Sequence, residues 1–104
     1  MFEREKPRYC SRGVAEELPI ELQAFLWTIL EQQKGLHDMD YLQVFQLQVD
    51  EEGTLSIHYS QEQPEYEQAY VLTMVGADMP EVHGKKLYII DDETHITMVF
   101  PEER

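Results

Sequence analysis

The sequence predicts an α+β fold, in which one long helix over about residues 18–34 packs on a mostly antiparallel sheet of five to six strands. Two observations lead to this prediction. Apolar residues recur at helical spacing over a long stretch only between Leu18 and Lys34, and the later chain alternates apolar and polar residues in short runs. Short turns join most of these runs, and consecutive strands joined in this way usually pair antiparallel.

The predicted helix carries two apolar stripes. The first has the spacing of a core-facing surface, and its members are Leu18, Leu22, Phe25, Leu26, Ile29 and Leu30. Pro19 suits the first helical turn, where its missing N–H is not needed. The second stripe runs through Ile20, Ala24 and Trp27 on roughly the opposite side. A helix on one face of a sheet needs only one apolar stripe, so we expect the second to be covered by the chain itself or by a partner.

The start of the chain is predicted to form a flexible polar tail over residues 1–7, and residues 8–104 to form a single α+β domain. Residues 8–14 are interpreted as a first strand, with Gly13 at its end. After the helix, Asp50 to Gly53 is expected to form a hairpin turn in which glycine supplies a positive φ. The other strands are expected over 41–49, 54–60, 68–75, 85–91 and 95–100.

The composition is that of an acidic folded protein. The chain has 104 residues, is 42% hydrophobic and carries a formal net charge of −13. Such a charge repels phosphate groups, so we expect neither nucleic acid nor an anionic membrane as a partner. Cys10 is the only cysteine, no apolar run reaches membrane-spanning length, and no signal peptide is recognised. A soluble cytoplasmic protein is the expectation.

Several stretches resemble one family of small proteins. They are the run from Arg8 to Trp27, the run from Tyr41 to Phe45, the run from Ser60 to Tyr66, and Asp91 to Glu93. Together they resemble an uncharacterised family of small cytosolic proteins from Gram-positive bacteria, the domain of unknown function numbered 960. The resemblance covers nearly the whole chain after the tail. It implies a compact intracellular domain and brings no activity, cofactor or functional residue.

No motif for catalysis, cofactor binding or metal binding is recognised. Arg8 and Arg12 flank Cys10 and favour its thiolate, but a buried cysteine that acts as a small apolar residue is the simpler interpretation. The segment from His37 to Asp40 holds three possible metal ligands, without a second spaced pair to complete a site. His58 and His95 converge only if their strands are neighbours. We therefore predict no cofactor and no metal.

The loop from Gln61 to Tyr66 is the most unusual connection. Three tyrosines, Tyr59, Tyr66 and Tyr70, lie in or beside it, and tyrosine is enriched in interfaces. A proline-containing strand connection explains the same composition. As a candidate interaction surface we take two groups of residues: Ile20, Ala24 and Trp27 on the helix, and Glu62, Glu65 and Tyr66 in this loop.

The expected function is that of a non-catalytic protein-interaction or regulatory module, which binds an unknown protein partner or forms a homodimer. One alternative is a small enzyme with an unrecognised site, which predicts a pocket where His58 or His95 meets carboxylates. Another is an acidic inhibitor that mimics nucleic acid, which predicts acidic groups spaced like phosphates along one face.

Overall fold

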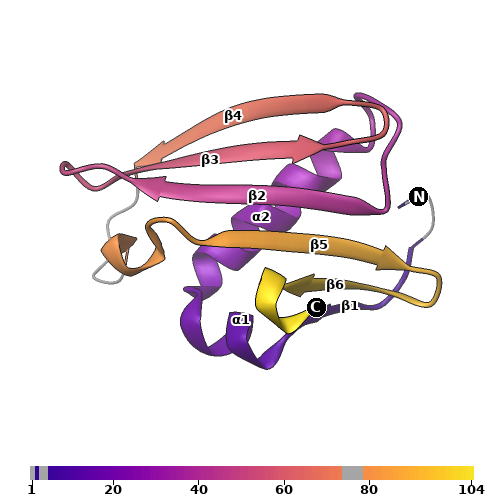
Figure 1. Ribbon diagram of the computed structural model, residues 1–104, viewed down its shortest axis with the longest axis horizontal. Coiled ribbons are helices and arrows are strands. Elements are labelled where there is room, and N and C mark those ends of the chain that lie inside the picture. The colour runs from indigo at the N-terminus through magenta and orange to yellow at the C-terminus, as the bar shows by residue number, and fades with distance from the viewer. Residues whose placement is uncertain (1, 3–4, 74–78) are drawn as a thin grey trace.

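The computed structural model describes residues 2, 5–73 and 79–104, which form an α+β fold (Figure 1). Within this part of the chain, the strands are β1 (Arg8–Cys10), β2 (Leu42–Val49), β3 (Thr54–Gln61), β4 (Tyr66–Thr73), β5 (Lys86–Asp92) and β6 (His95–Val99). The α-helices are α1 (Arg12–Glu17) and α2 (Ile20–Gln33), and the 3-10 helices are η1 (Met79–Val82) and η2 (Pro101–Glu103).

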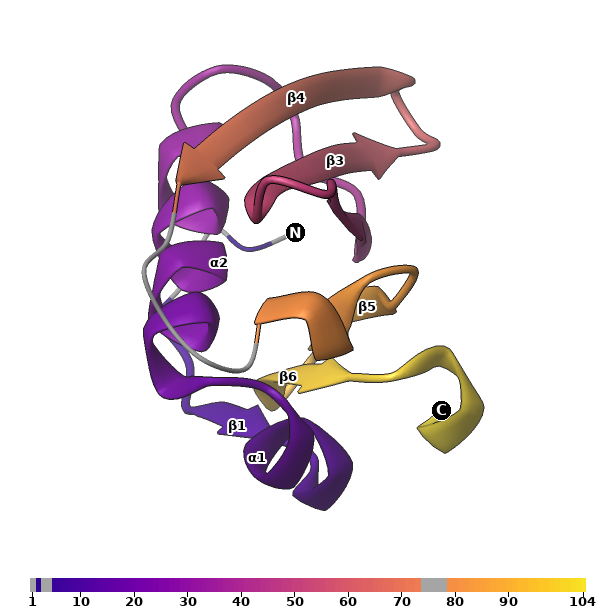
Figure 2. The same cartoon turned by 90° about the vertical axis from the view of Figure 1, so that its left-hand side faces the viewer.

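The six strands form one sheet with the order β1-β6-β5-β2-β3-β4. All neighbouring strands pair antiparallel except β1 and β6, which are parallel. Helix α2 lies across one face of the sheet (Figure 2). The predicted fold class is therefore confirmed. The β2–β3 turn also forms as expected, because Gly53 has a φ of 85° and the Asp50 carboxylate accepts hydrogen bonds from the Glu52 and Thr54 amides.

The core lies between α2 and the sheet. Alternate residues along each strand point to the same face of the sheet, and most of those on the face toward α2 are buried apolar side chains. They include Phe45, Leu47, Leu55, Ile57, Leu87, Ile89, Ile96 and Met98, which cluster with Leu22, Leu26, Ile29 and Leu30 of the helix. The first predicted stripe of the helix is thus the core-facing one, although Phe25 is only half-buried.

The region before α2 differs from the predicted first strand over 8–14. The strand ends at Cys10, and Ser11 begins helix α1, where its hydroxyl oxygen accepts a hydrogen bond of 3.1 Å from the Val14 amide. This is the N-capping interaction that serine favours. Pro19 occupies the N-cap position of α2, where its carbonyl accepts hydrogen bonds from the Leu22 and Gln23 amides. The long helix therefore begins at Ile20 rather than at residue 18, and Pro19 lies just before the first turn instead of in it.

Residues 2 and 6 differ from the loose polar tail expected over residues 1–7. The side chain of Phe2 is 1% exposed and belongs to the core cluster. The Lys6 ammonium lies 2.6 Å from the buried Asp91 carboxylate, which also accepts a hydrogen bond from the Phe2 amide. Phe2, the only large apolar residue among residues 2 and 5–7, is therefore fixed in two ways. Its ring packs in the core, and its backbone amide bonds to the Asp91 carboxylate.

Other strand boundaries differ from the prediction by a few residues at most. The strand predicted over 68–75 is β4, which begins at Tyr66 and is described to Thr73. Residues 74 and 75 of that prediction lie outside the described residues, as do 76–78 of the loop expected to follow. Part of that loop, Met79–Val82, forms the 3-10 helix η1.

Glu103, near the C-terminal end, bonds to the start of α1. Its carboxylate accepts hydrogen bonds from the Ser11 hydroxyl at 2.6 Å, the Phe100 amide at 3.0 Å and the Gly13 amide at 3.1 Å. These bonds, that from Ser11 above all, hold the pKa of Glu103 below its ordinary value. The carboxylate is exposed, so solvent screens the interaction.

Replacing Glu103 with glutamine is expected to lower the free energy of unfolding by at most about 1 kcal/mol at pH 7. Because the folded pKa is depressed, this stabilisation is full above about pH 4.3, the ordinary value for glutamate, and is lost as the pH falls through the folded value. Urea unfolding at several pH values measures the difference. Glu102→Gln is the control, and an equal effect of both variants would contradict the assigned role.

Candidate interaction surfaces

The second apolar stripe of the helix divides into a covered part and an exposed part. The Trp27 ring is half-buried, and the Arg8 guanidinium lies 5.2 Å from its centroid. Arg8 also forms an ion pair with Glu31 on the same helix. Strand β1 therefore places a residue of the chain itself over Trp27, and such a cation–π contact stabilises the arrangement by about 0.5–1 kcal/mol at an exposed site.

Ile20 and Ala24 form the exposed part of the stripe. The side chain of Ile20 is 73% exposed, and Ala24 is also exposed. Both lie in the first half of α2, and Ile20 directly follows the proline that caps the helix. Burial of an isoleucine side chain is favourable by about 1.5–3 kcal/mol, so a partner that covers Ile20 would gain binding free energy from this contact.

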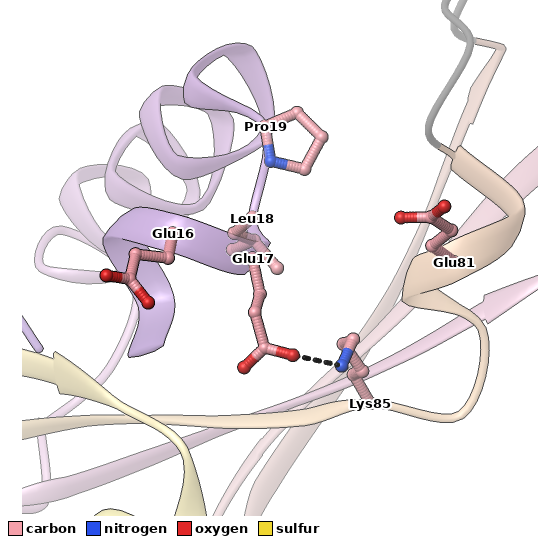
Figure 3. A pocket seen from close by; sticks show the side chains of 6 residues that line it. All are labelled: Glu16, Glu17, Leu18, Pro19, Glu81 and Lys85. Atoms are coloured by element: carbon pink, nitrogen blue, oxygen red, sulfur yellow. Dashed lines mark hydrogen bonds and ion pairs between the residues drawn. The ribbon is translucent and has the colours of Figure 1, made fainter. Parts of the chain in front are cut away.

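A pocket of about 390 Å³ lies between α1, the residues that lead into α2, and η1 (Figure 3). Ile20 is the next residue along the chain after Pro19, which lines this pocket. Its lining residues are Glu16, Glu17, Leu18, Pro19, Glu81 and Lys85. We call this the corner pocket, and we call the pocket together with Ile20 the α1–α2 corner. The pocket brings together two segments that are about 60 residues apart in the sequence, so its existence depends on the tertiary fold.

The corner pocket is acidic. Its lining holds three carboxylates and one ammonium group, which gives a formal charge of −3 + 1 = −2. The ammonium of Lys85 lies 3.4 Å from the Glu17 carboxylate and 5.2 Å from the centroid of the Phe100 ring. Lys85 is therefore already engaged by groups of the chain itself. Figure 3 shows the Glu17–Lys85 contact, with Glu81 on η1, across the pocket from α1.

The other predicted interaction residues lie near the opposite end of α2. Glu62 and Glu65 are exposed in the β3–β4 turn, which lies at the end of the sheet near the last turn of α2 (Figure 1). Tyr66 is half-buried and stacks on the His37 ring, with 3.9 Å between the ring centroids. The six candidate residues therefore do not form one continuous surface.

A buried hydrogen-bond network supports this second end of the molecule. The Gln43 amide nitrogen donates to the Gln61 side-chain oxygen at 2.8 Å and to the Asp40 carbonyl at 2.9 Å. The Gln61 amide nitrogen donates to the Pro64 carbonyl at 2.7 Å, and the Tyr59 hydroxyl donates to Gln43. These bonds join the loop after α2 to the β3–β4 turn, and fully bonded buried amides are the usual way to tolerate polar side chains in a core.

Sequence reasoning missed the role of Gln43 and Gln61. Both are buried, with 0% and 3% of the side chain exposed. The available signal was the period of two, because Gln43 shares a strand face with Phe45, and Gln61 shares one with Tyr59. Burial also raises the pKa of Tyr59 above its ordinary value, so its hydroxyl stays protonated and can donate.

The histidines of the enzyme alternative do not converge. His58 lies on β3 and His95 on β6, and strands β5 and β2 separate them in the sheet. His58 lies 3.8 Å from the Glu67 carboxylate, whereas His95 packs edge-on against Tyr9. A shared site for the two histidines is therefore excluded by the strand order.

The surroundings of Cys10 do not activate its thiol. The thiol of Cys10 donates to the Gln23 side-chain oxygen at 3.4 Å, and burial raises the pKa of the thiol, which opposes formation of a nucleophilic thiolate. Neither the requirements of a metal site nor those of a membrane-spanning helix are met among the described residues. Within residues 2, 5–73 and 79–104, no group of three or more His, Cys, Asp or Glu side chains is placed to hold a metal ion. No helix in the same part of the chain is both long enough and apolar enough to cross a membrane.

The fold and these surfaces define a small α+β domain with one helix-covered sheet and an acidic corner. Residues 7–103 match the family described as a Staphylococcal protein of unknown function (DUF960), and the chain belongs to that family. The resemblance found in the sequence is confirmed. A crystal structure of a protein of unknown function from Enterococcus faecalis is similar over 100% of this chain and 98% of the other, with a TM-score of 0.84 and 30% identity. No curated protein matches the sequence.

Proposed function

We propose that the protein is a non-catalytic interaction module that binds a protein partner through the α1–α2 corner. The observation that supports this function is the exposure of Ile20, which is 73% accessible and directly follows Pro19 of the corner-pocket lining. Single exposed apolar residues are common on protein surfaces. An exposed apolar side chain next to a concave surface is different, because a partner can fill the pocket and cover the side chain together.

Two further observations favour this surface over the other candidates. Trp27, on the same stripe, is already contacted by Arg8 of the chain itself, so it needs no partner. Tyr66 likewise stacks on His37, and the amide network holds the turn that precedes it. His58 and His95 lie on strands that β5 and β2 separate, so the two histidines do not share a site. These contacts support binding at the α1–α2 corner rather than catalysis elsewhere.

The test is a capture experiment with matched variants. Wild-type protein, Ile20→Ser and Val71→Ser are immobilised and incubated with a native cytosolic extract, and bound proteins are quantified by mass spectrometry. Val71 is the control because it is 70% exposed on β4, where Tyr70 and Leu72 pack against the core and Val71 therefore points to the face of the sheet that α2 does not cover. We expect one partner that binds wild type and Val71→Ser alike and binds Ile20→Ser about tenfold more weakly.

Equal recovery of every bound protein by the two serine variants would contradict the proposal. Sedimentation of the purified protein over a range of concentrations tests whether the partner is a second copy of the chain. In that case wild type and Val71→Ser self-associate, and Ile20→Ser remains monomeric.

A further inference from the structure

Resting on the proposed function, we infer that the corner pocket receives a lysine or arginine side chain of the partner, while an adjacent apolar side chain of the same partner packs on Ile20. The partner would thus present a short basic and apolar segment. Three features argue for this occupant. They are the charge of the pocket, the ion pairs that its carboxylates already form, and the apolar residues in its lining.

The charge of the pocket favours a cation. Three carboxylates line it against the single ammonium of Lys85, and the whole chain carries a formal net charge of −13. An anionic group entering the pocket would be repelled by both the lining and the surrounding protein. A basic partner is attracted by the same charges, which raises its rate of association at low ionic strength.

The three carboxylates of the pocket, those of Glu17, Glu16 and Glu81, differ in whether a basic residue of the chain already pairs with them. Glu17 is paired with Lys85 at 3.4 Å. The described partner of Glu16 is Arg12 at 3.0 Å, in a surface pair whose side chains are 62% and 91% exposed, and such pairs contribute little. Glu81 has no ion pair with any residue that the structure describes. Glu16 and Glu81 are thus available to an incoming cation.

The lining also suits the stem of a long basic side chain. Leu18 is 3% exposed and Pro19 is half-buried, so the lining combines two apolar residues with four charged ones. Lysine and arginine have this same division, with an apolar stem and a charged head that remains near water. A bare metal ion has no group to place against Leu18 and Pro19. The exposed Ile20 directly after Pro19 then provides the contact for a neighbouring apolar side chain.

The test uses the peptide acetyl-Gly-Leu-Arg-Leu-Gly-amide as the probe and compares it with the same peptide containing glutamine in place of arginine. Binding is followed by chemical-shift changes of the backbone amides in ¹⁵N-labelled protein. We expect the arginine peptide to cause saturable shifts around residues 16–20 and 81–85, and added salt to weaken them. We expect the glutamine peptide to bind at least about tenfold more weakly.

The variant Glu16→Gln/Glu81→Gln should reduce binding of the arginine peptide by about tenfold. The matched control is Glu51→Gln/Glu52→Gln, which makes the same change of net charge in the exposed β2–β3 turn and should bind like wild type. Equal weakening by both double variants would overturn the inference, because it would indicate attraction to overall charge alone. Equal binding of the two peptides, or no shifts with the arginine peptide, would overturn it as well.

The same double variants separate this inference from the proposed function. A captured partner that is lost with Ile20→Ser but retained by Glu16→Gln/Glu81→Gln would overturn the basic side chain and leave the interaction surface in place. A partner retained by all the variants would overturn both. Loss with Ile20→Ser and with Glu16→Gln/Glu81→Gln, but not with the turn variant, supports both.

Discussion

Replacing Phe2 with alanine is expected to lower the free energy of unfolding by about 3–5 kcal/mol, the usual cost of removing a buried phenylalanine ring. The ring is 1% exposed and lies in the same cluster as the core residues of α2 and the sheet. Its removal leaves a cavity that a close-packed interior fills only in part. Urea unfolding followed by far-UV circular dichroism measures the loss.

Leu36→Ala is the control for this experiment, because Leu36 is a large apolar residue that is 64% exposed. Its replacement should change the stability by less than about 0.5 kcal/mol. If Phe2→Ala were equally mild, residue 2 would belong to a loose tail in solution and the core would not include it.

Replacing Asp91 with asparagine is expected to cost about 3–5 kcal/mol, because it removes one partner of a buried ion pair. The Asp91 side chain is 0% exposed and that of Lys6 is 16% exposed, with 2.6 Å between the carboxylate oxygen and the ammonium nitrogen. The second carboxylate oxygen accepts a hydrogen bond of 2.5 Å from the Phe2 amide. The substitution leaves the Lys6 ammonium poorly solvated and without its countercharge.

The next residue in the chain provides the matched control. Asp92 is exposed, so Asp92→Asn should change the stability by less than about 0.5 kcal/mol. The double variant Lys6→Met/Asp91→Asn should lose less than the sum of the two single variants, because no unpaired buried charge remains. An Asp91→Asn variant as stable as Asp92→Asn would show that the pair contributes nothing.

Local patterns in the sequence were sufficient for the elements whose signals are local. The spacing of Leu22, Leu26 and Ile29 predicted the core face of α2, and alternation with tight turns predicted the antiparallel strands. Helix α1 was missed because it is only six residues long and contains Gly13, which lowers helix propensity. Its signal was Ser11, a favoured capping residue that precedes it.

The contacts between distant segments could not be predicted in this way. Nothing in the sequence around Phe2 indicates that Asp91 will bond to its amide, because the two are 89 residues apart. The same is true of Arg8 over Trp27, which requires β1 to pair with β6 beside the helix. The second stripe identified Ile20 as a candidate contact residue, but the corner pocket needs Glu81 and Lys85 from a remote part of the chain.

The parallel pairing of β1 with β6 has a consequence for biosynthesis. Arg8 is aligned with Ile96 and Cys10 with Met98, so the partner of the first strand is synthesised only after β2, β3, β4 and β5. The contacts of Phe2 and Lys6 with Asp91 likewise cannot form before Asp91 is synthesised. The hairpin of β2 and β3 can form during synthesis, whereas closure of the core at β1 must follow the emergence of β6. Closure of this fold therefore joins two segments between which the rest of the sheet has already been synthesised.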